Sequence, residues 1–276
     1  MFTIAALTVK EMLRKRILLI GAILTVAFLA LYSMGLHYAG RDMARIGNPL
    51  IRFALSSQML SAGLYLSSFI LAFLSIFSAI GTISGEIENG ALHAIVTKPI
   101  PRRDIVLGKF FGYASILDIY ASLLFTAVVT AARTFLGAPT SSELSALGLF
   151  VLEPLLLLAL TMLGTTLLPT MGNGVAMVML FSVGMVGGLV EQIGVWVKSS
   201  SMVTIGIITS LVIPADSIYR KVSSTLFTGA DDLLPASQLG PFSSASAPSV
   251  WMVVYAGVYL IAALSLAVRT FARRDI

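Results

Sequence analysis

The sequence predicts an all-α polytopic membrane protein, and three observations support this fold class. The chain has 276 residues, of which 57% are hydrophobic and 11% are charged, and its mean hydropathy is +0.95. Soluble domains are about 25% charged. Six apolar runs are long enough to cross a hydrocarbon layer of about 30 Å. Basic residues gather at the ends of these runs, as topology signals do. We therefore expect six transmembrane helices surrounded mainly by lipid.

The first 36 residues predict two helices of different character. Residues 2–16 carry apolar Ile4, Leu7, Met12 and Leu13 among charged side chains, which is typical of an amphipathic helix lying in the membrane interface. The apolar run that follows is long enough to span and lacks a small-residue cleavage site, so it indicates a first span and not a signal peptide. The six predicted spans cover residues 17–36, 58–83, 109–132, 145–168, 174–197 and 250–268.

The longest connection, residues 198–249, is predicted to lie on the extracytoplasmic side. Its apolar part, residues 202–213, is too short to cross the membrane. This part is interpreted as a surface helix or a partial re-entrant helix, followed by a loop that contains IPADSIYRKV and a Gly/Ser/Pro-rich stretch. If residues 202–213 did span, the two termini would lie on opposite sides of the membrane.

The basic residues predict that both termini are cytoplasmic, in a cell (inner) membrane. With the N-terminus inside, eleven basic residues lie on the cytoplasmic side and seven on the other, and the inside residues lie closest to span ends. The cytoplasmic set is Lys10, Arg14, Lys15, Arg16, Lys98, Arg102, Arg103, Lys109, Arg269, Arg273 and Arg274; the other set is Arg41, Arg45, Arg52, Arg133, Lys198, Arg220 and Lys221.

A polar segment, SGEIENGALHAIVTKPIPRRDIVLGK, joins the second and third spans from Ser84 to Lys109. Its order of residue types resembles the cytoplasmic coupling segment of ABC-2 type transporter permeases: a Glu, a Gly-x-Leu, a short apolar run, Pro, a basic residue, and Gly-Lys opening the next span. The matching positions are Glu86, Glu88, Gly90, Leu92, Pro99, Arg102, Arg103, Gly108 and Lys109. The proline and acid of IPAD, residues 213–216, also resemble the corresponding place in that family.

The resemblance implies a permease subunit of an ATP-driven transporter, with the coupling helix within residues 84–108. It implies two partner ATP-binding cassette subunits, a second permease copy in a homodimer, and ATP with Mg²⁺ on the partner subunits and no cofactor on this chain. The implied ATPase-coupling residues are Glu86, Glu88, Asn89, Gly90, Leu92, His93, Pro99, Arg102 and Arg103.

Physical reasoning about the same segment predicts a helix from Gly85 to Thr97. Its polar stripe would contain Glu86, Asn89, His93 and Thr97, with Ile87, Ala91, Ala94 and Ile95 on the opposite side. Pro99 and Pro101 would end it. Arg102, Arg103 and Lys109 would hold the chain at the headgroup level. Glu88 lies near the apolar stripe and would need a partner if buried. The alternative is a solvated loop helix whose position is set by topology alone.

Two acidic residues are predicted near the middle of the membrane. Asp118 and Glu153 lie about 12–14 Å deep in their spans, from opposite sides, at 1.5 Å per residue. Such a carboxyl group faces a protein interior or a polar cavity. We expect protonation or hydrogen bonds from groups such as Tyr113, Tyr120 or Thr161. The two acids are a candidate translocation pathway for substrate or protons, or else form interhelical hydrogen bonds. Glu153-Pro154 also predicts a kink.

The fifth span carries Gly184, Gly187 and Gly188, which permit close helix approach. This face could meet a second copy or a neighbouring span of the same chain. Glu191 and Lys198, near the outer end of that span, are predicted to be interfacial.

Several function classes are excluded or disfavoured. Gly108-Lys109 is followed by Phe110 and lacks the earlier glycine of a phosphate loop, so ATP hydrolysis is expected on a partner and not on this chain. There is no cysteine, and His37 and His93 are predicted on opposite sides of the membrane. The basic residues form no stripe with interleaved aromatics, so we expect no nucleic-acid partner. The alternatives to the permease are an ion- or proton-coupled carrier that uses Asp118 and Glu153 without ATP, a lipid-modifying enzyme, and a scaffold.

Overall fold

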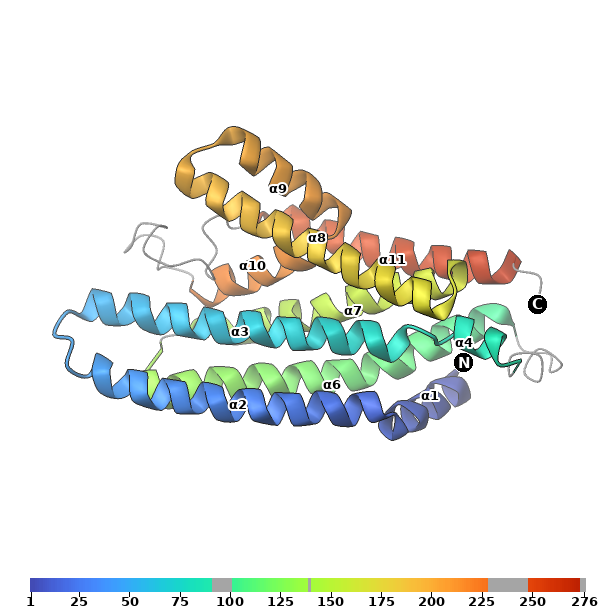
Figure 1. The fold of residues 1–276 in the computed structure, drawn as a ribbon, viewed down its shortest axis with the longest axis horizontal. Helices are drawn as coiled ribbons and strands as arrows, with labels where there is room; N and C mark the ends of the chain where they lie inside the picture. The colour runs from blue at the N-terminus through green and yellow to red at the C-terminus, as the bar shows by residue number, and fades with distance from the viewer. Residues whose placement is uncertain (91–100, 139, 228–247, 274–276) are drawn as a thin grey trace.

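The computed structural model describes residues 1–90, 101–138, 140–227 and 248–273. These residues form an elongated bundle of helices, with no strand among them (Figure 1). The helices are α1 (Phe2–Arg14), α2 (Arg16–Met43), α3 (Pro49–Ala79), α4 (Ser84–Glu88), α6 (Arg102–Leu136), α7 (Glu143–Leu167), α8 (Thr170–Val197), α9 (Ser200–Val212), α10 (Ala215–Leu226) and α11 (Val250–Arg273).

The prediction of an all-α fold with six membrane-length helices is confirmed. Six helical stretches of the described chain are long and apolar enough to cross a membrane, the second of them being α3 and α4 together. The helices extend beyond most of the predicted spans; α6, for example, has 35 residues. The apolar pattern marks only the hydrocarbon layer of about 30 Å, whereas a helix also continues through the headgroup regions.

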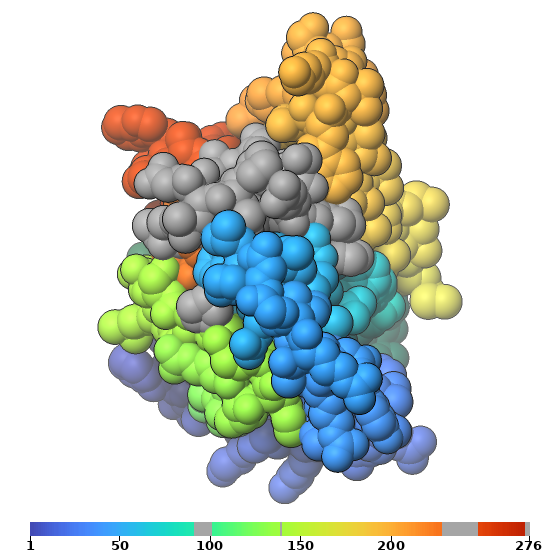
Figure 2. Space-filling model, turned by 90° about the vertical axis from the view of Figure 1, so that its left-hand side faces the viewer, coloured from blue at the N-terminus to red at the C-terminus, as the bar shows by residue number. Residues whose placement is uncertain are grey.

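The bundle has two distinct ends. The N-terminus, α1, α4 and the end of α11 lie together at one end, which we call the proximal end (Figure 1). The connection between α2 and α3 lies at the opposite end, which we call the distal end. Figure 2 views the molecule from the distal end, where the α8–α9 hairpin projects from one edge. Helix α1 and the last turn of α11 therefore lie at the same end of the bundle as α4.

Helix α7 occupies the centre of the bundle. It packs against α3, α6, α10 and α11, and most of its side chains are buried. The helix continues through Pro154, whose carbonyl accepts a hydrogen bond of 2.7 Å from the Ser75 hydroxyl on α3. A proline removes one backbone donor from the helix, and this side-chain contact ties the same turn to the neighbouring helix.

Helices α9 and α10 form a broken pair at the outer side of the bundle. They meet at Ile213 and Pro214 and are bent by 108°. Helix α9 exposes Ile205, Ile208 and Leu211, whereas α10 is buried along most of its length. The prediction of a loop after residue 213 is wrong for residues 215–226. This stretch folds as a helix because Ile218, Val222 and Leu226 fall at helical spacing and are all buried in the bundle.

Helix α1 packs directly on α6. A Cβ atom at Gly112 would lie 2.7 Å from the Cβ of Thr8, and one at Gly108 would lie 2.9 Å from the Cβ of Ile4. Two glycines four residues apart thus form a groove that receives α1, as small residues do at helix interfaces in membranes. Met12 of α1 is buried in the main apolar core. The predicted amphipathic helix is therefore part of the bundle and not only a surface anchor.

Candidate functional site

A buried lysine joins the two ends of the polar segment. Lys109, in the second turn of α6, is 5% exposed, and its Nζ lies 2.5 Å from Oε2 of Glu86 on α4. The same Nζ donates a hydrogen bond of 2.6 Å to the carbonyl of Thr82, in the break between α3 and α4. Lys109 is predicted to lie at headgroup level, and that depth stays a prediction, but the side chain is buried within the bundle. It turns inward because Glu86 and a free carbonyl of the helix break satisfy its charge.

A second lysine extends this arrangement to α1. Lys15 lies between α1 and α2, and its Nζ pairs with Glu11 at 3.0 Å. It also donates a hydrogen bond of 2.7 Å to the hydroxyl of Tyr113, one helical turn from Lys109 on α6. We call Glu11, Lys15, Glu86, Lys109 and Tyr113 the proximal network. It connects α1, α4 and α6 at the end where the chain begins.

Glu88 binds the start of α8. Its two carboxylate oxygens accept hydrogen bonds of 3.0 Å from the backbone N–H of Thr170 and 3.1 Å from the Thr170 hydroxyl. A carboxylate at a helix N-terminus is stabilised by the unpaired N–H groups and by the helix dipole. Glu88 is exposed and so does not need the buried partner considered from the sequence. It links the end of α4 to the fifth membrane-length helix.

Side chains of α7 and α8 hold the break between α3 and α4. The Thr165 hydroxyl accepts a hydrogen bond of 3.0 Å from the backbone N–H of Ser84. The Asn173 side-chain amide donates a hydrogen bond of 2.9 Å to the carbonyl of Ile80. These contacts satisfy backbone groups that the break leaves without helical partners. The break is therefore fixed in one geometry by the neighbouring helices.

The α6 side of the polar segment contacts both ends of the chain. The Arg102 guanidinium donates hydrogen bonds of 3.2 Å and 3.4 Å to the carbonyls of Ala272 and Phe271 at the end of α11. Asp104 lies 3.6 Å from the N-terminal amine and 3.8 Å from Arg103. The two sides of the polar segment thus bind α1, α7, α8 and α11 in addition to the helices they begin and end.

The predicted continuous helix from Gly85 to Thr97 is wrong at its middle. Helix α4 ends at Glu88, and Gly90 adopts a left-handed conformation with φ of +70°. A glycine in this conformation is a common helix terminator, because it has no Cβ to clash. Asn89 lies in the same turn and is exposed. Leu92, His93, Thr97 and Pro99 lie outside the described residues, so their predicted stripe stays a prediction.

A second charged cluster lies inside the bundle. The Arg220 guanidinium on α10 binds both oxygens of Glu191 on α8, at 2.7 Å and 2.9 Å, and Asp216 at 2.9 Å. It also donates to the hydroxyls of Ser210 and Ser217, each at 3.2 Å. Arg220 is 1% exposed. We call Arg220, Glu191 and Asp216 the Arg220 cluster; it holds α8, α9 and α10 together.

The Arg220 cluster gives two charged residues surroundings that the sequence did not predict. Glu191 and Arg220 are both buried within the bundle. The interfacial depth of Glu191 and the extracytoplasmic side of Arg220 stay predictions. The glycines of α8 face the junction of α9 and α10. A Cβ at Gly184 would lie 3.3 Å from the Cβ of Ile213, and one at Gly188 would overlap the Asp216 carboxylate. Of the two readings of this glycine face, packing within one chain is the one observed. The four-residue spacing of Asp216 and Arg220 was the signal available in the sequence.

The two intramembrane acids lie in different surroundings. Glu153 on α7 is buried and accepts a hydrogen bond of 2.5 Å from the Ser68 hydroxyl on α3. It lines a cavity of about 10 Å³ together with Asp216 and Tyr219, among others. Asp118 on α6 is half-buried, and its Oδ1 has no hydrogen-bond partner in the described chain. The structure therefore places Glu153 beside the Arg220 cluster and does not bring Asp118 into it.

The predicted hydrogen-bond partners of these acids are wrong. Tyr113 binds Lys15, Tyr120 donates to the carbonyl of Gly21, and Thr161 donates to the carbonyl of Leu157. Thr161 bonds within its own helix, whereas Tyr113 and Tyr120 of α6 bond to groups in or next to α2. In the part of the chain that is described, no group of three or more histidine, aspartate or glutamate side chains could hold a metal ion.

Comparison of the sequence with models of known protein families identifies the family of this chain. A model described as ABC-2 family transporter protein matches residues 2–276. The chain belongs to the ABC-2 transporter family. It is therefore the multi-pass membrane permease of an ABC transporter, and membership implies an ATP-binding cassette partner. Permeases of this family are the membrane component and are generally not catalytic. No curated protein matches the chain in sequence.

Proposed function

We propose that this permease couples ATP hydrolysis on a separate ATP-binding cassette subunit to export. In this proposal the ATPase subunit contacts the polar segment 84–109, and its movement is transmitted through that segment to the membrane helices. A soluble ATPase can move membrane helices only through an element that is fixed to several of them. The observation that carries this proposal is the Lys109–Glu86 pair of 2.5 Å, which joins the helix entering the segment to the helix leaving it.

The surroundings of that pair support a rigid transmission element. Glu88 connects the segment to α8, Arg102 connects it to α11, and Lys15 connects its α6 side to α1. A displacement of the segment would therefore act on helices far apart in the sequence. Asn89 and Gly90 are exposed at its surface, where a partner could reach them.

The proposed assembly contains two copies of this chain and two ATPase subunits, with ATP and Mg²⁺ bound by the ATPases. Both termini are proposed to lie in the cytoplasm, on the side of the ATPases, in a cell membrane. The basic residues support this orientation, because Arg14, Arg16, Arg269 and Arg273 all lie at the proximal end. The apolar side chains that α8 and α9 expose suit either lipid or a second copy.

The coupling proposal is tested in a complex of the permease and its ATPase in liposomes. We expect Glu86→Gln to lower the ATPase rate that the permease stimulates, because the Lys109 charge then lacks its partner. Glu143→Gln is the matched control, since Glu143 also forms a 2.5 Å ion pair, with Arg133, but lies at the beginning of α7 away from the segment. Equal rates for the wild type and Glu86→Gln would contradict the proposal.

The orientation is tested by cysteine labelling, since the chain has no native cysteine. Thr3→Cys lies in α1 at the proximal end, and Ser200→Cys is the first residue of α9, directly after the connection from α8. In intact cells, a membrane-impermeant maleimide should label Ser200→Cys and not Thr3→Cys. The reverse pattern would place the polar segment outside the cell and end the coupling proposal.

An ion- or proton-coupled carrier without ATP is the second candidate function. It is favoured by buried Glu153, one oxygen of which has no hydrogen-bond partner among the described residues. The cavity beside it, about 10 Å³, has room for no more than about one water molecule. This candidate requires transport by the purified chain alone in liposomes under an ion gradient, reduced in Glu153→Gln. Asp118→Asn should also reduce transport if Asp118 belongs to the pathway.

A further inference from the structure

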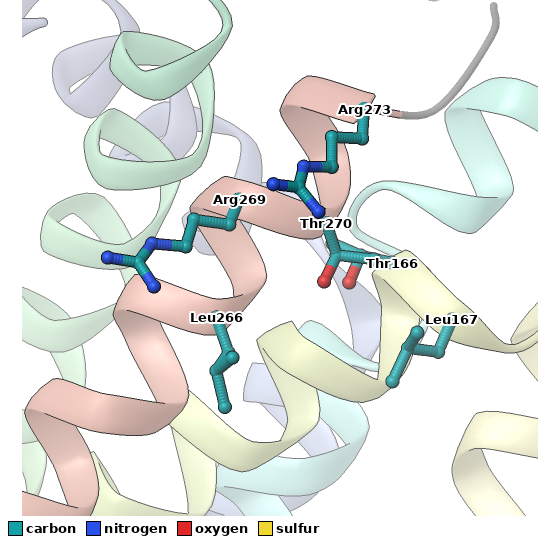
Figure 3. A pocket seen from close by; sticks show the side chains of 6 residues that line it. All are labelled: Thr166, Leu167, Leu266, Arg269, Thr270 and Arg273. Carbon is teal, nitrogen blue, oxygen red and sulfur yellow. The ribbon is translucent and has the colours of Figure 1, made fainter.

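A hollow at the proximal end lies between the ends of α7 and α11. It has a volume of about 610 Å³ and is lined by Thr166, Leu167, Leu266, Arg269, Thr270 and Arg273 (Figure 3). Ligand pockets of proteins have volumes of about 300–1,000 Å³. Among the described residues that line it, none carries a carboxylate and two are arginines.

The two arginines have no ion-pair partner in the described structure. Acidic side chains at the proximal end are engaged elsewhere: Glu11 with Lys15, Glu86 with Lys109, and Asp104 with the N-terminal amine. Two positive charges one helical turn apart repel each other when no anion lies between them. The pocket therefore has a positive potential that nothing among the described residues neutralises.

Arginines near a helix end often serve only to neutralise the C-terminal carbonyls. At the end of α11 this role is already filled, because Arg102 donates to the carbonyls of Phe271 and Ala272. Arg269 and Arg273 are exposed, and Figure 3 shows both guanidinium groups extending to the same side of α11. Their position thus suits an external anion better than the carbonyls of their own helix.

The pocket changes from apolar to polar along α11. Leu266 comes first, Arg269 and Thr270 follow, and Arg273 is in the last turn, about 10 Å further along the axis at 1.5 Å per residue. In Figure 3, Leu266 and Leu167 point away from Arg273, and the hydroxyls of Thr270 and Thr166 lie between Arg273 and these leucines. A ligand that combines a phosphate with an acyl chain matches this order.

We propose that the pocket binds the phosphate headgroup of an anionic phospholipid, with the guanidinium groups of Arg269 and Arg273 on the phosphate and the acyl chain against Leu266. Basic pockets between membrane helices at the water boundary are suited to acidic lipid headgroups. The hydroxyl of Thr270 is available as a further donor to the phosphate oxygens. The inference depends on the membrane setting of the family and not on ATP coupling or on the direction of transport.

The test is native mass spectrometry of the purified full chain in detergent, titrated with short-chain phosphatidylglycerol, phosphatidylcholine or glycerol phosphate. We expect phosphatidylglycerol to bind more tightly than phosphatidylcholine. Arg269→Gln and Arg273→Gln should each weaken phosphatidylglycerol binding about fivefold, the factor for about 1 kcal/mol per basic residue at a membrane surface. Arg269→Lys, which keeps the charge, should retain most of the affinity and controls for misfolding.

Arg14→Gln is the matched control for nonspecific attraction. Arg14 is an exposed arginine in the last turn of α1 at the same end, with no ion pair within the described chain. It should leave phosphatidylglycerol affinity unchanged. Equal affinity of the wild type and the Arg269→Gln/Arg273→Gln double variant would overturn the site. Glycerol phosphate binding as tightly as phosphatidylglycerol would overturn the lipid as its occupant and leave a free phosphate compound instead.

Discussion

The proximal network and the Arg220 cluster both join helices through ion pairs, but they differ in access to water. In the proximal network the side chains of Lys109 and Glu86 are 6% and 26% exposed. In the Arg220 cluster the side chains of Arg220, Glu191 and Asp216 are 2%, 7% and 6% exposed. A buried charge that loses its partner has no water to replace it, whereas a partly exposed one does. Glu86 can therefore exchange partners, whereas the carboxylates of the Arg220 cluster cannot.

This difference matches the positions of the two sets. The proximal network lies beside the exposed turn of Asn89 and Gly90, where a soluble subunit could dock and change the local contacts. The Arg220 cluster lies where α8, α9 and α10 meet, and it fixes the broken helix pair to the bundle. Movement is thus expected at the proximal end, with the α8–α10 unit moving as one body.

The largest predicted effect is the loss of Arg220. Arg220→Met leaves Glu191 and Asp216 buried without a cation, so the free energy of unfolding should fall by about 3–5 kcal/mol. Thermal unfolding in detergent measures this change. Lys221→Met is the control: it removes the same charge from the next residue, which is half-exposed and forms no ion pair in the described chain.

A triple variant sharpens the same prediction. Arg220→Met combined with Glu191→Gln and Asp216→Asn removes all three charges, and it should be more stable than Arg220→Met alone. The reason is that uncompensated carboxylates, and not the missing ion pair, account for most of the loss. If the triple variant were the less stable of the two, the attraction between Arg220 and the two carboxylates would itself stabilise the fold. The contrast in water access drawn between the proximal network and the Arg220 cluster would then be incorrect.

The second effect concerns Lys109. Lys109→Met should lower the free energy of unfolding by about 1.5–3 kcal/mol, less than Arg220→Met, because Glu86 can regain water when its partner is lost. The same thermal unfolding assay ranks the two variants. A loss as large as that of Arg220→Met would show that Glu86 is as poorly hydrated as Glu191, against its greater exposed fraction.

The third effect concerns the contact between α1 and α6. Gly112→Leu should lower the free energy of unfolding by about 1–3 kcal/mol, because the added side chain overlaps Thr8 and the carbonyl of Ala5. Gly148→Leu is the matched control, since a Cβ at Gly148 on α7 meets nothing within 4 Å. Similar stability of the two leucine variants, again by thermal unfolding, would show that α1 does not dock in the glycine groove.

The smallest predicted effect concerns Glu88. Glu88→Gln keeps a hydrogen-bond acceptor for Thr170 but removes the charge at the start of α8, so the free energy of unfolding should fall by only about 0.3–1 kcal/mol. The ATPase rate of the assembled complex is the more sensitive readout. A stability loss above that of Gly112→Leu would mean that Glu88 belongs with the buried charges and not with the exchangeable ones.

The sequence predicted the fold class and the six membrane-length helices because both follow from the hydropathy of contiguous residues, which can be summed over a window of the chain. The end of α4 could not be predicted in this way. Residues 85–97 have an amphipathic pattern, but the left-handed conformation of Gly90 interrupts it, and glycine is compatible with both outcomes. The end of α4 depends on this local backbone conformation and on tertiary contacts, which hydropathy does not describe.

The Arg220 cluster was missed for a different reason. Residues 215–226 have a low mean apolar content for a buried helix, since Asp216, Ser217 and Arg220 are polar. Their burial is possible only because Glu191, distant in the sequence, supplies the countercharge. Counting charges at span ends treats each residue separately and therefore gives no indication that Arg220 is buried. Paired burial of distant charges has no signature in a single sequence beyond the four-residue spacing within α10.

The most direct test of the coupling account is cross-linking from the turn after α4. A single cysteine at Asn89 in this cysteine-free chain, joined to a bifunctional reagent, should capture the ATP-binding cassette subunit in the membrane, whereas Ser200→Cys at the opposite end should not. Capture from both positions, or from Ser200→Cys alone, would contradict the claim that the polar segment is where the ATPase acts on the permease.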